Sequence, residues 1–227
     1  MRRLCLSLFT IALLPISFFG RGDERTDPIK VADYKKPIRV ACVGDSITFG
    51  FGWNDPRSYP SQLGKLLGED WTVRNFGVGG RTMLRKGDFP YWKEKAFKDA
   101  QGFQPNVVIL MLGTNDTKPW NWRHKDDFAA DYKEMVERFE HLPSKPRVFC
   151  CLPPPVPGKG NYGINETGID AEIPLIREVA KDTAAGTVNM HAALERKPEL
   201  LPDRVHPNAR GYELMAEAAY KRLTGNK

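Results

Sequence analysis

Ser46, Asp203 and His206 carry the side chains that nucleophilic ester cleavage requires. Ser46 follows an apolar run in the stretch VACVGDSITFGFG, which spans residues 40–52. Asp203 precedes His206 by three residues, a spacing that lets one tight loop aim the carboxylate at Nδ1 of the ring and leave Nε2 facing the serine. A nucleophile, a base and an orienting acid together form a catalytic triad.

Each of these three residues also has a purely structural interpretation. Ser46 would serve as a turn or N-cap residue, His206 as a surface histidine beside a proline turn, and Asp203 as a turn or cap residue. No other histidine combines an acid at so short a spacing with an adjacent proline, which makes them weaker candidates for the base. They are His124, His141 and His191.

Donors for the negatively charged oxygen of a tetrahedral intermediate are available in two further segments. Asn115 offers a side-chain amide in GTND, and Gly80 offers a backbone N–H in GVGGRT, where the chain can approach a substrate closely. The backbone N–H of Ser46 is a third candidate. Such donors typically contribute a factor of about 10²–10³ each in kcat. Asn115 and Gly80 also fit ordinary turns.

Three common site motifs do not match. Thr48 stands where the nucleophile elbow G-x-S-x-G needs its second glycine. In the second segment, Thr82 stands where a dinucleotide-binding motif needs its third glycine. The stretch GDSITFGFG lacks the lysine of a phosphate-binding loop. These comparisons argue against an ordinary α/β-hydrolase and against a nucleotide-binding protein.

The elements that position these residues alternate along the chain. We expect strands at 38–43, 71–77, 106–113, 147–152 and 187–190, and helices at 58–68, 91–100, 128–142, 172–181 and 209–223. Such alternation predicts an α/β domain with a parallel sheet covered by helices on both faces. The candidate residues then gather at the carboxyl ends of the strands, where such sheets bind ligands. The proline- and glycine-rich loop 153–168 is expected to line that site.

The amino-terminal segment differs from the rest. Arg2 and Arg3 precede an apolar run, so residues 1–20 are interpreted as a signal peptide, with an uncleaved membrane anchor as the alternative. A polar lead-in at 21–36 and a single domain at 37–227 follow. We therefore expect export to a periplasmic or extracellular location, and no membrane contact beyond that possible anchor.

Charge and cysteine usage narrow the partners further. The net charge of +6 is spread among acidic residues without a basic block, so no nucleic-acid partner is expected. Cys42, Cys150 and Cys151 lie in apolar strand-like runs and are interpreted as buried free thiols. No zinc-ligand spacing is present. The sequence does not indicate an oligomeric state.

Four blocks of the chain resemble the SGNH (GDSL-type) hydrolases. GDSIT matches the family's first block, NFGVGGRT its second, GTND its third and DRVHPN its last, in the family's order from Gly44 to Asn208. The resemblance carries the nucleophile to Ser46, the oxyanion asparagine to Asn115, and the acid and base to Asp203 and His206. The oxyanion glycine of the second block corresponds to Gly80, with Gly79 as the alternative.

This resemblance implies both a fold and a mechanism. The fold would be a three-layer α/β/α sandwich on a central parallel sheet, of the flavodoxin-like SGNH hydrolase type. Ser46 would attack an ester carbonyl, His206 would take its proton, and Asp203 would orient the ring. The backbone N–H groups of Ser46 and Gly80 and the amide of Asn115 would hold the oxyanion. No metal and no organic cofactor is implied.

The pattern looks most like bacterial acetylesterases of the sialate or xylan O-acetylesterase type, and we expect a small-molecule or glycan ester as substrate. Flat aromatic rings pack against sugar faces, and tryptophans cluster after the first and third blocks. The candidate substrate-binding residues are Asp45, Trp53, Arg81, Trp120 and Trp122. Two alternatives remain open: a lysophospholipase or thioesterase-like acyl hydrolase, and an inactive secreted glycan-binding protein.

Overall fold

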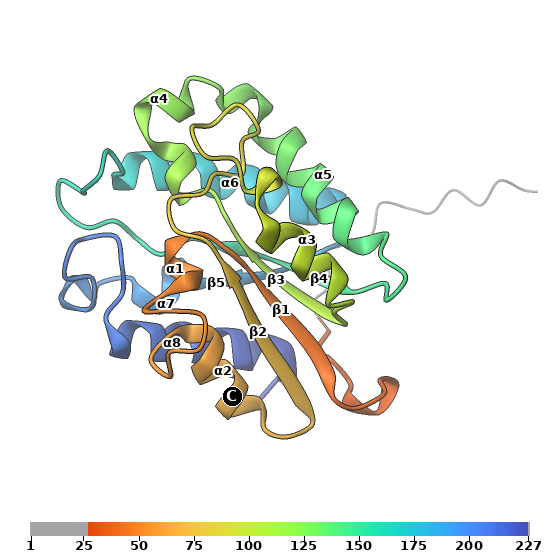
Figure 1. Ribbon diagram of the computed structural model, residues 1–227. Helices are drawn as coiled ribbons and strands as arrows, with labels where there is room; N and C mark the ends of the chain where they lie inside the picture. Colours follow the sequence, from red (N-terminus) through yellow and green to blue (C-terminus); the bar gives the residue numbers. More distant parts are fainter. Residues whose placement is uncertain (1–26, 227) are drawn as a thin grey trace, which may run out of the picture.

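Five parallel strands form one sheet in the order β2-β1-β3-β4-β5 in the computed structural model, which describes residues 27–226 (Figure 1). The strands are β1 (Ile38–Gly44), β2 (Trp71–Gly77), β3 (Val107–Met111), β4 (Arg147–Leu152) and β5 (Gly186–Asn189). This order is that of the flavodoxin-like fold. The predicted leader and the lead-in up to residue 26 lie outside the described residues.

Helices cover both faces of the sheet, as the alternating pattern predicted (Figure 1). One face packs against α2 (Tyr59–Leu67), α7 (Met190–Leu194) and α8 (Ala209–Thr224), and the other against α3 (Lys95–Gly102), α5 (Phe128–Glu140) and α6 (Glu166–Asp182). Neighbouring residues of β1 alternate between these two cores: Val40 and Cys42 belong to the first, Ala41 and Val43 to the second. The predicted three-layer sandwich is therefore confirmed.

Several element boundaries differ by a few residues from the sequence-based expectation, and the start of α6 differs most. Helix α6 begins at Glu166 rather than at 172, because the Asn165 side chain accepts a hydrogen bond from the Gly168 N–H and caps the helix six residues earlier. The irregular loop after β4 is correspondingly shorter. The four-residue helices α1 (Ser46–Phe49) and α4 (Pro119–Trp122) were not predicted, since so short a helix shows no hydrophobic period.

The cysteines among residues 27–226, Cys42, Cys150 and Cys151, are buried thiols that take part in no disulfide, as predicted. Within residues 27–226, no helix is long and apolar enough to cross a membrane.

Candidate active site

The predicted catalytic and oxyanion-hole residues meet at the carboxyl edge of the sheet, between β1 and β3. Here the chain order reverses, because β2 lies on one side of β1 while β3 lies on the other. In open parallel sheets this reversal separates the loops and leaves a crevice for a ligand. Ser46 follows β1 and Asn115 follows β3, so their positions are fixed by two adjacent buried strands.

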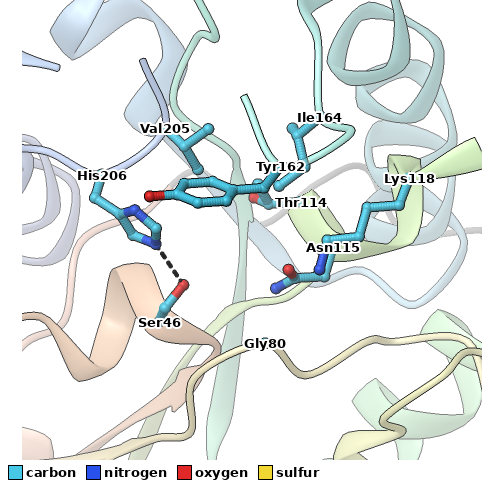
Figure 2. Close-up of a pocket in the computed structure, with 9 residues that line it drawn as sticks. All are labelled: Ser46, Gly80, Thr114, Asn115, Lys118, Tyr162, Ile164, Val205 and His206. Carbon is cyan, nitrogen blue, oxygen red and sulfur yellow. Dashed lines mark hydrogen bonds between the residues drawn. The ribbon is translucent and has the colours of Figure 1, made fainter. Parts of the chain in front are cut away.

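Close packing at the end of β1 brings Ser46 to the surface of the crevice. A Cβ on Gly44 would lie 2.5 Å from the carbonyl oxygen of Met111 in β3, so only glycine allows this approach. Asp45 then caps the short helix α1 by accepting a hydrogen bond from the Ile47 N–H at 2.9 Å. Ser46 is the first residue of α1, and its hydroxyl faces the cavity (Figure 2).

A chain of hydrogen bonds joins the three triad residues. Ser46 Oγ lies 2.8 Å from His206 Nε2, and His206 Nδ1 lies 2.7 Å from Asp203 Oδ2 (Figure 2 shows the first contact). The tight loop expected from the Asp-x-x-His spacing is present. Asp203 Oδ1 accepts the backbone N–H groups of Val205 and His206, at 2.9 and 2.7 Å.

These contacts decide the charge of Asp203 and the tautomer of His206. Partial burial by itself would raise the pKa of Asp203, but hydrogen bonds from the His206 N–H, the His206 ring and the Val205 N–H outweigh it and lower that pKa. An ionised carboxylate only accepts, so Nδ1 of His206 must carry the proton. In the neutral ring, Nε2 is then the acceptor for the Ser46 hydroxyl, as a general base requires.

Gly80 lines the cavity near Ser46 (Figure 2). Its φ is 79°, a conformation that favours glycine, and a Cβ at this position would meet no atom within 4 Å. The open side of Gly80 is thus available to a ligand. Gly79, the alternative, lies against Ser46, with its ideal Cβ 3.8 Å from that of the serine.

Asn115 also lines the cavity, and its amide is held from behind. Nδ2 lies 3.2 Å from Asp45 Oδ2 and 3.2 Å from the Arg81 carbonyl oxygen. Both bonds are at the long end of the normal range, so an oxyanion can compete for one of the two amide hydrogens. Burial raises the pKa of Asp45 to about 6, although the hydrogen bond from the Ile47 N–H and the positive charge of Lys118 act in the opposite direction.

The segment that carries Gly80 is fixed by Asp116, the last residue of GTND. Its two carboxylate oxygens accept the backbone N–H groups of Met83, at 2.9 Å, and Leu84, at 2.6 Å. Asp116 is fully buried, and this burial raises its pKa to about 8 despite the two bonds. Asn115 and Asp116 therefore connect the third block of the sequence to the second.

Ser46, His206, Gly80 and Asn115 line one cavity of about 250 Å³. Asp203 contacts His206 but is not among the lining residues. Five of the lining residues were not predicted individually: Thr114, Lys118, Tyr162, Ile164 and Val205. Tyr162 and Ile164 come from the loop 153–168, which was expected to line the site. The sequence therefore indicated the loop that contains Tyr162, but no local pattern indicated that Tyr162 itself would reach the cavity.

Most of the candidate substrate-binding residues lie away from this cavity, and none of them is among its lining residues. Asp45 is buried and holds Asn115, whereas Arg81 pairs with Glu94 at 2.9 Å. Trp53 donates from its indole to the Gly77 carbonyl, and Trp122 packs edge-on against Phe128. These four side chains contact other parts of the protein and do not line the cavity, so their contact with substrate stays a prediction.

Trp120 is the exception among the tryptophans. It is about half exposed, donates to Asp88 Oδ2 at 2.9 Å, and lies against Gly163, a neighbour of two cavity-lining residues. It therefore stands at the rim of the site rather than inside it.

One group of side chains in the described part of the chain could approach a cation. Ligand atoms of Glu166, Asp170 and His191 lie within 4.8 Å of one another. Glu166 and His191 hydrogen-bond each other at 2.7 Å, and Glu166 also accepts the Val156 N–H. These bonds raise the pKa of His191 and, against the effect of burial, lower that of Glu166, as an ion pair would. None of the three lines the cavity.

Comparison with known proteins agrees with this geometry. The sequence profile of the GDSL-like Lipase/Acylhydrolase family matches residues 42–214, which include all four blocks. The chain belongs to this family. It is 41% identical over 202 residues to an acetylxylan esterase of Xylanibacter ruminicola, a match that covers 79% of this chain and 42% of that protein.

A second relative of this GDSL-like chain is a multidomain esterase of Ruminococcus flavefaciens, 30% identical over 260 residues, covering 98% of this chain and 32% of that protein. The chain thus spans less than half the length of these curated relatives. Among solved structures, a carbohydrate acetylesterase, Est24 of Sinorhizobium meliloti, has a TM-score of 0.68 at 18% identity, covering 82% of this chain and 98% of that one.

A putative arylesterase of Agrobacterium tumefaciens has the same TM-score of 0.68, at 22% identity over 82% of this chain and 98% of that one. At such low identities these two structures establish the fold of the GDSL-like chain. They agree with the order of strands and the layers described above.

Proposed function

We propose that this protein is a secreted serine esterase that removes O-acetyl groups from carbohydrate through an acyl-enzyme. The observation that carries the proposal is the continuous hydrogen-bonded series Ser46–His206–Asp203, which ends at a cavity lined by Gly80 and Asn115. The purely structural interpretations of Ser46 and His206 do not account for a hydrogen bond between two side chains that are 160 residues apart in the sequence.

The proposed reaction follows from these contacts. Nε2 of His206 takes the hydroxyl proton as Ser46 Oγ bonds to the ester carbonyl carbon, and the carbonyl electrons move to oxygen. The N–H groups of Ser46 and Gly80 and the amide of Asn115 stabilise that oxyanion. The protonated ring then gives its proton to the departing alcohol. Water, deprotonated by the same ring, releases the acid and restores Ser46.

The dimensions of the cavity favour a short acyl group. Its volume of about 250 Å³ lies below the 300–1,000 Å³ of typical small-molecule pockets. Ile164 and Val205, both buried, form an apolar wall, and neither has room behind it for a long chain. An acetyl group fits such a space better than a fatty acyl group does.

The carbohydrate part of the proposal has two supports. One relative, 41% identical, is an acetylxylan esterase. Two exposed aromatic side chains, Trp120 and Tyr162, also lie at the cavity. The basic and apolar leader predicted at 1–20 would bring such an enzyme to glycans outside the cytoplasm.

The test compares p-nitrophenyl acetate, p-nitrophenyl octanoate and acetylated xylo-oligosaccharide, with Ser46→Ala in parallel. We expect turnover of the acetate and of the oligosaccharide, little of the octanoate, and loss of about 10⁴-fold or more in the variant. A preference for octanoate would instead identify a lipid or thioester hydrolase. Equal inactivity of both proteins, with binding of the glycan, would identify a binding protein.

A further inference from the structure

A tight turn at 161–164 presents one aromatic side chain to the cavity. The Asn161 N–H donates to the Ile164 carbonyl at 3.0 Å, and the Ile164 N–H donates back to the Asn161 carbonyl at 2.7 Å. The two central residues, Tyr162 and Gly163, have φ values of 54° and 80°. Positive φ at both positions is the geometry of a type I′ turn.

The first central position of this turn is unusual for tyrosine. Asparagine, aspartate and glycine are the residues that adopt positive φ readily, and a bulky residue there costs conformational energy. Backbone strain of this kind concentrates at functional sites. The identity of Tyr162 is therefore not explained by the turn and requires another reason.

The surroundings hold the turn in place. Asn161 Nδ2 donates to the Asp203 carbonyl oxygen at 3.1 Å, which ties the turn to the triad loop. Gly163 lies against Trp120, with its ideal Cβ 3.2 Å from Cη2 of the indole. Gly160 permits the chain to enter the turn, since a Cβ there would overlap the Ile164 carbonyl oxygen.

The tyrosine ring stands beside the catalytic base and remains open to solvent. Its centroid lies 5.8 Å from that of the His206 ring, and its hydroxyl donates to Asp203 Oδ2 at 3.3 Å. The residue is nevertheless 54% exposed, and Figure 2 shows the ring between His206 and Asn115. The negative charge of Asp203 raises the pKa of the Tyr162 hydroxyl, which keeps it a donor.

We propose that Tyr162 is a specificity-determining residue, whose exposed ring face packs against the pyranose ring that carries the acetyl group. This inference rests on the proposed carbohydrate esterase function. The hydroxyl, by bonding Asp203, fixes the direction of the ring, so that little side-chain entropy is lost when a sugar binds. The face of an aromatic ring packs against the axial C–H groups of a sugar ring, and the sugar hydroxyl groups around the edge of that ring stay in solvent.

The experiment uses the full chain and two acetate esters. O-acetylated methyl β-xylopyranoside presents a ring to Tyr162, and vinyl acetate presents the same acetyl group without one. Tyr162→Asn removes the ring but retains the turn, because Asn-Gly is the preferred type I′ sequence. Tyr162→Phe retains the ring and removes the hydroxyl.

We expect Tyr162→Asn to raise KM for the sugar ester about tenfold, with kcat/KM for vinyl acetate within about threefold of the wild type. Tyr162→Phe should keep KM for the sugar ester within about threefold. Phe51→Leu is the matched control, because Phe51 is an exposed aromatic that does not line the cavity. Phe51→Leu should leave KM for the sugar ester and kcat/KM for vinyl acetate unchanged.

Several outcomes would overturn the inference. An equal loss on both esters in Tyr162→Asn would mean that the ring only shields the triad. A Tyr162→Phe variant as impaired as Tyr162→Asn would assign the effect to the hydroxyl. If the wild type cleaves the sugar ester and Tyr162→Asn has an unchanged KM, the inference alone fails. If the wild type cleaves vinyl acetate but not the sugar ester, the carbohydrate function fails with it.

Discussion

The carboxylate of Asp203 accepts several hydrogen bonds at once and determines the tautomer of His206. Its two oxygens receive two backbone N–H groups, the His206 ring and the Tyr162 hydroxyl. These donors keep the carboxylate charged although it is partly buried, and the charge in turn sets the tautomer of His206. Removing the charge without changing the size of the side chain should therefore stop the base from working.

Asp203→Asn tests this dependence. The amide keeps the shape of Asp203, but its NH₂ group can donate a hydrogen bond to Nδ1 of His206. This favours the tautomer in which Nε2 carries the proton and no longer accepts from Ser46. We expect kcat to fall about 10⁴-fold, with KM for p-nitrophenyl acetate nearly unchanged. Circular dichroism should confirm that the variant is folded. A loss below tenfold would show that Asp203 does not orient the base.

Glu172 is a residue that the proposed mechanism does not use. Both of its carboxylate oxygens are buried without a hydrogen-bond partner among the described residues, beside Gly113. Burial raises its pKa well above the usual value, and the charges of Asp116 and Asp45 act in the same direction. A carboxyl whose pKa is raised on folding favours the folded state at low pH and loses that contribution as pH rises through the folded pKa.

Glu172→Gln should therefore stabilise the protein at high pH only. At pH 8 we expect the free energy of unfolding to rise by about 1–3 kcal/mol, because the variant carries no buried acid to ionise. At pH 4, where both side chains are neutral, the difference should nearly vanish. Urea unfolding at both pH values measures this. A variant that is less stable at pH 8 would show that the carboxylate has a favourable role.

At the scale of elements, the position of the loop after β2 depends on hydrogen bonds to the loop after β3. The segment after β2 carries Gly80, and Asp116 after β3 holds that segment through Met83 and Leu84. The hydrogen bonds come from two backbone N–H groups, and a single carboxylate satisfies both. An asparagine has only one acceptor oxygen, so one N–H would lose its partner.

Asp116→Asn should loosen the oxyanion segment. We expect kcat for p-nitrophenyl acetate to fall about 10–100-fold, since small displacements of catalytic donors have effects of this size. The matched control is Asp131→Asn, because Asp131 accepts the Arg85 N–H on the same segment, at 2.8 Å, but farther from the cavity. Asp131→Asn should retain kcat within about threefold. Equal effects of the two variants would contradict a role specific to Gly80.

At the scale of the whole molecule, the strand order brings the site together. Because β1 and β3 are adjacent and β2 lies on the outer side of β1, the loops after all three strands open toward one crevice. The long helix α8 then begins directly after the loop that carries Asp203 and His206, and its packing against the sheet sets the position of that loop. Residues near both ends of the domain therefore meet.

The sequence by itself determined the parallel sheet, the helices on both faces and the four blocks that hold Ser46, Gly80, Asn115, Asp203 and His206. Hydrophobic period and short motifs are local properties, and local properties can be detected without a structure. It also indicated that loop 153–168 would line the site.

Only the tertiary structure decided which side chains reach the cavity. Tyr162 and Lys118 line it, whereas Asp45, Trp53, Arg81 and Trp122 are occupied by partners elsewhere. The direction of a side chain depends on neighbours that are distant in the sequence, such as Asp203 for Tyr162 and Asn115 for Asp45. No spacing along the chain encodes those contacts, because packing between elements creates them.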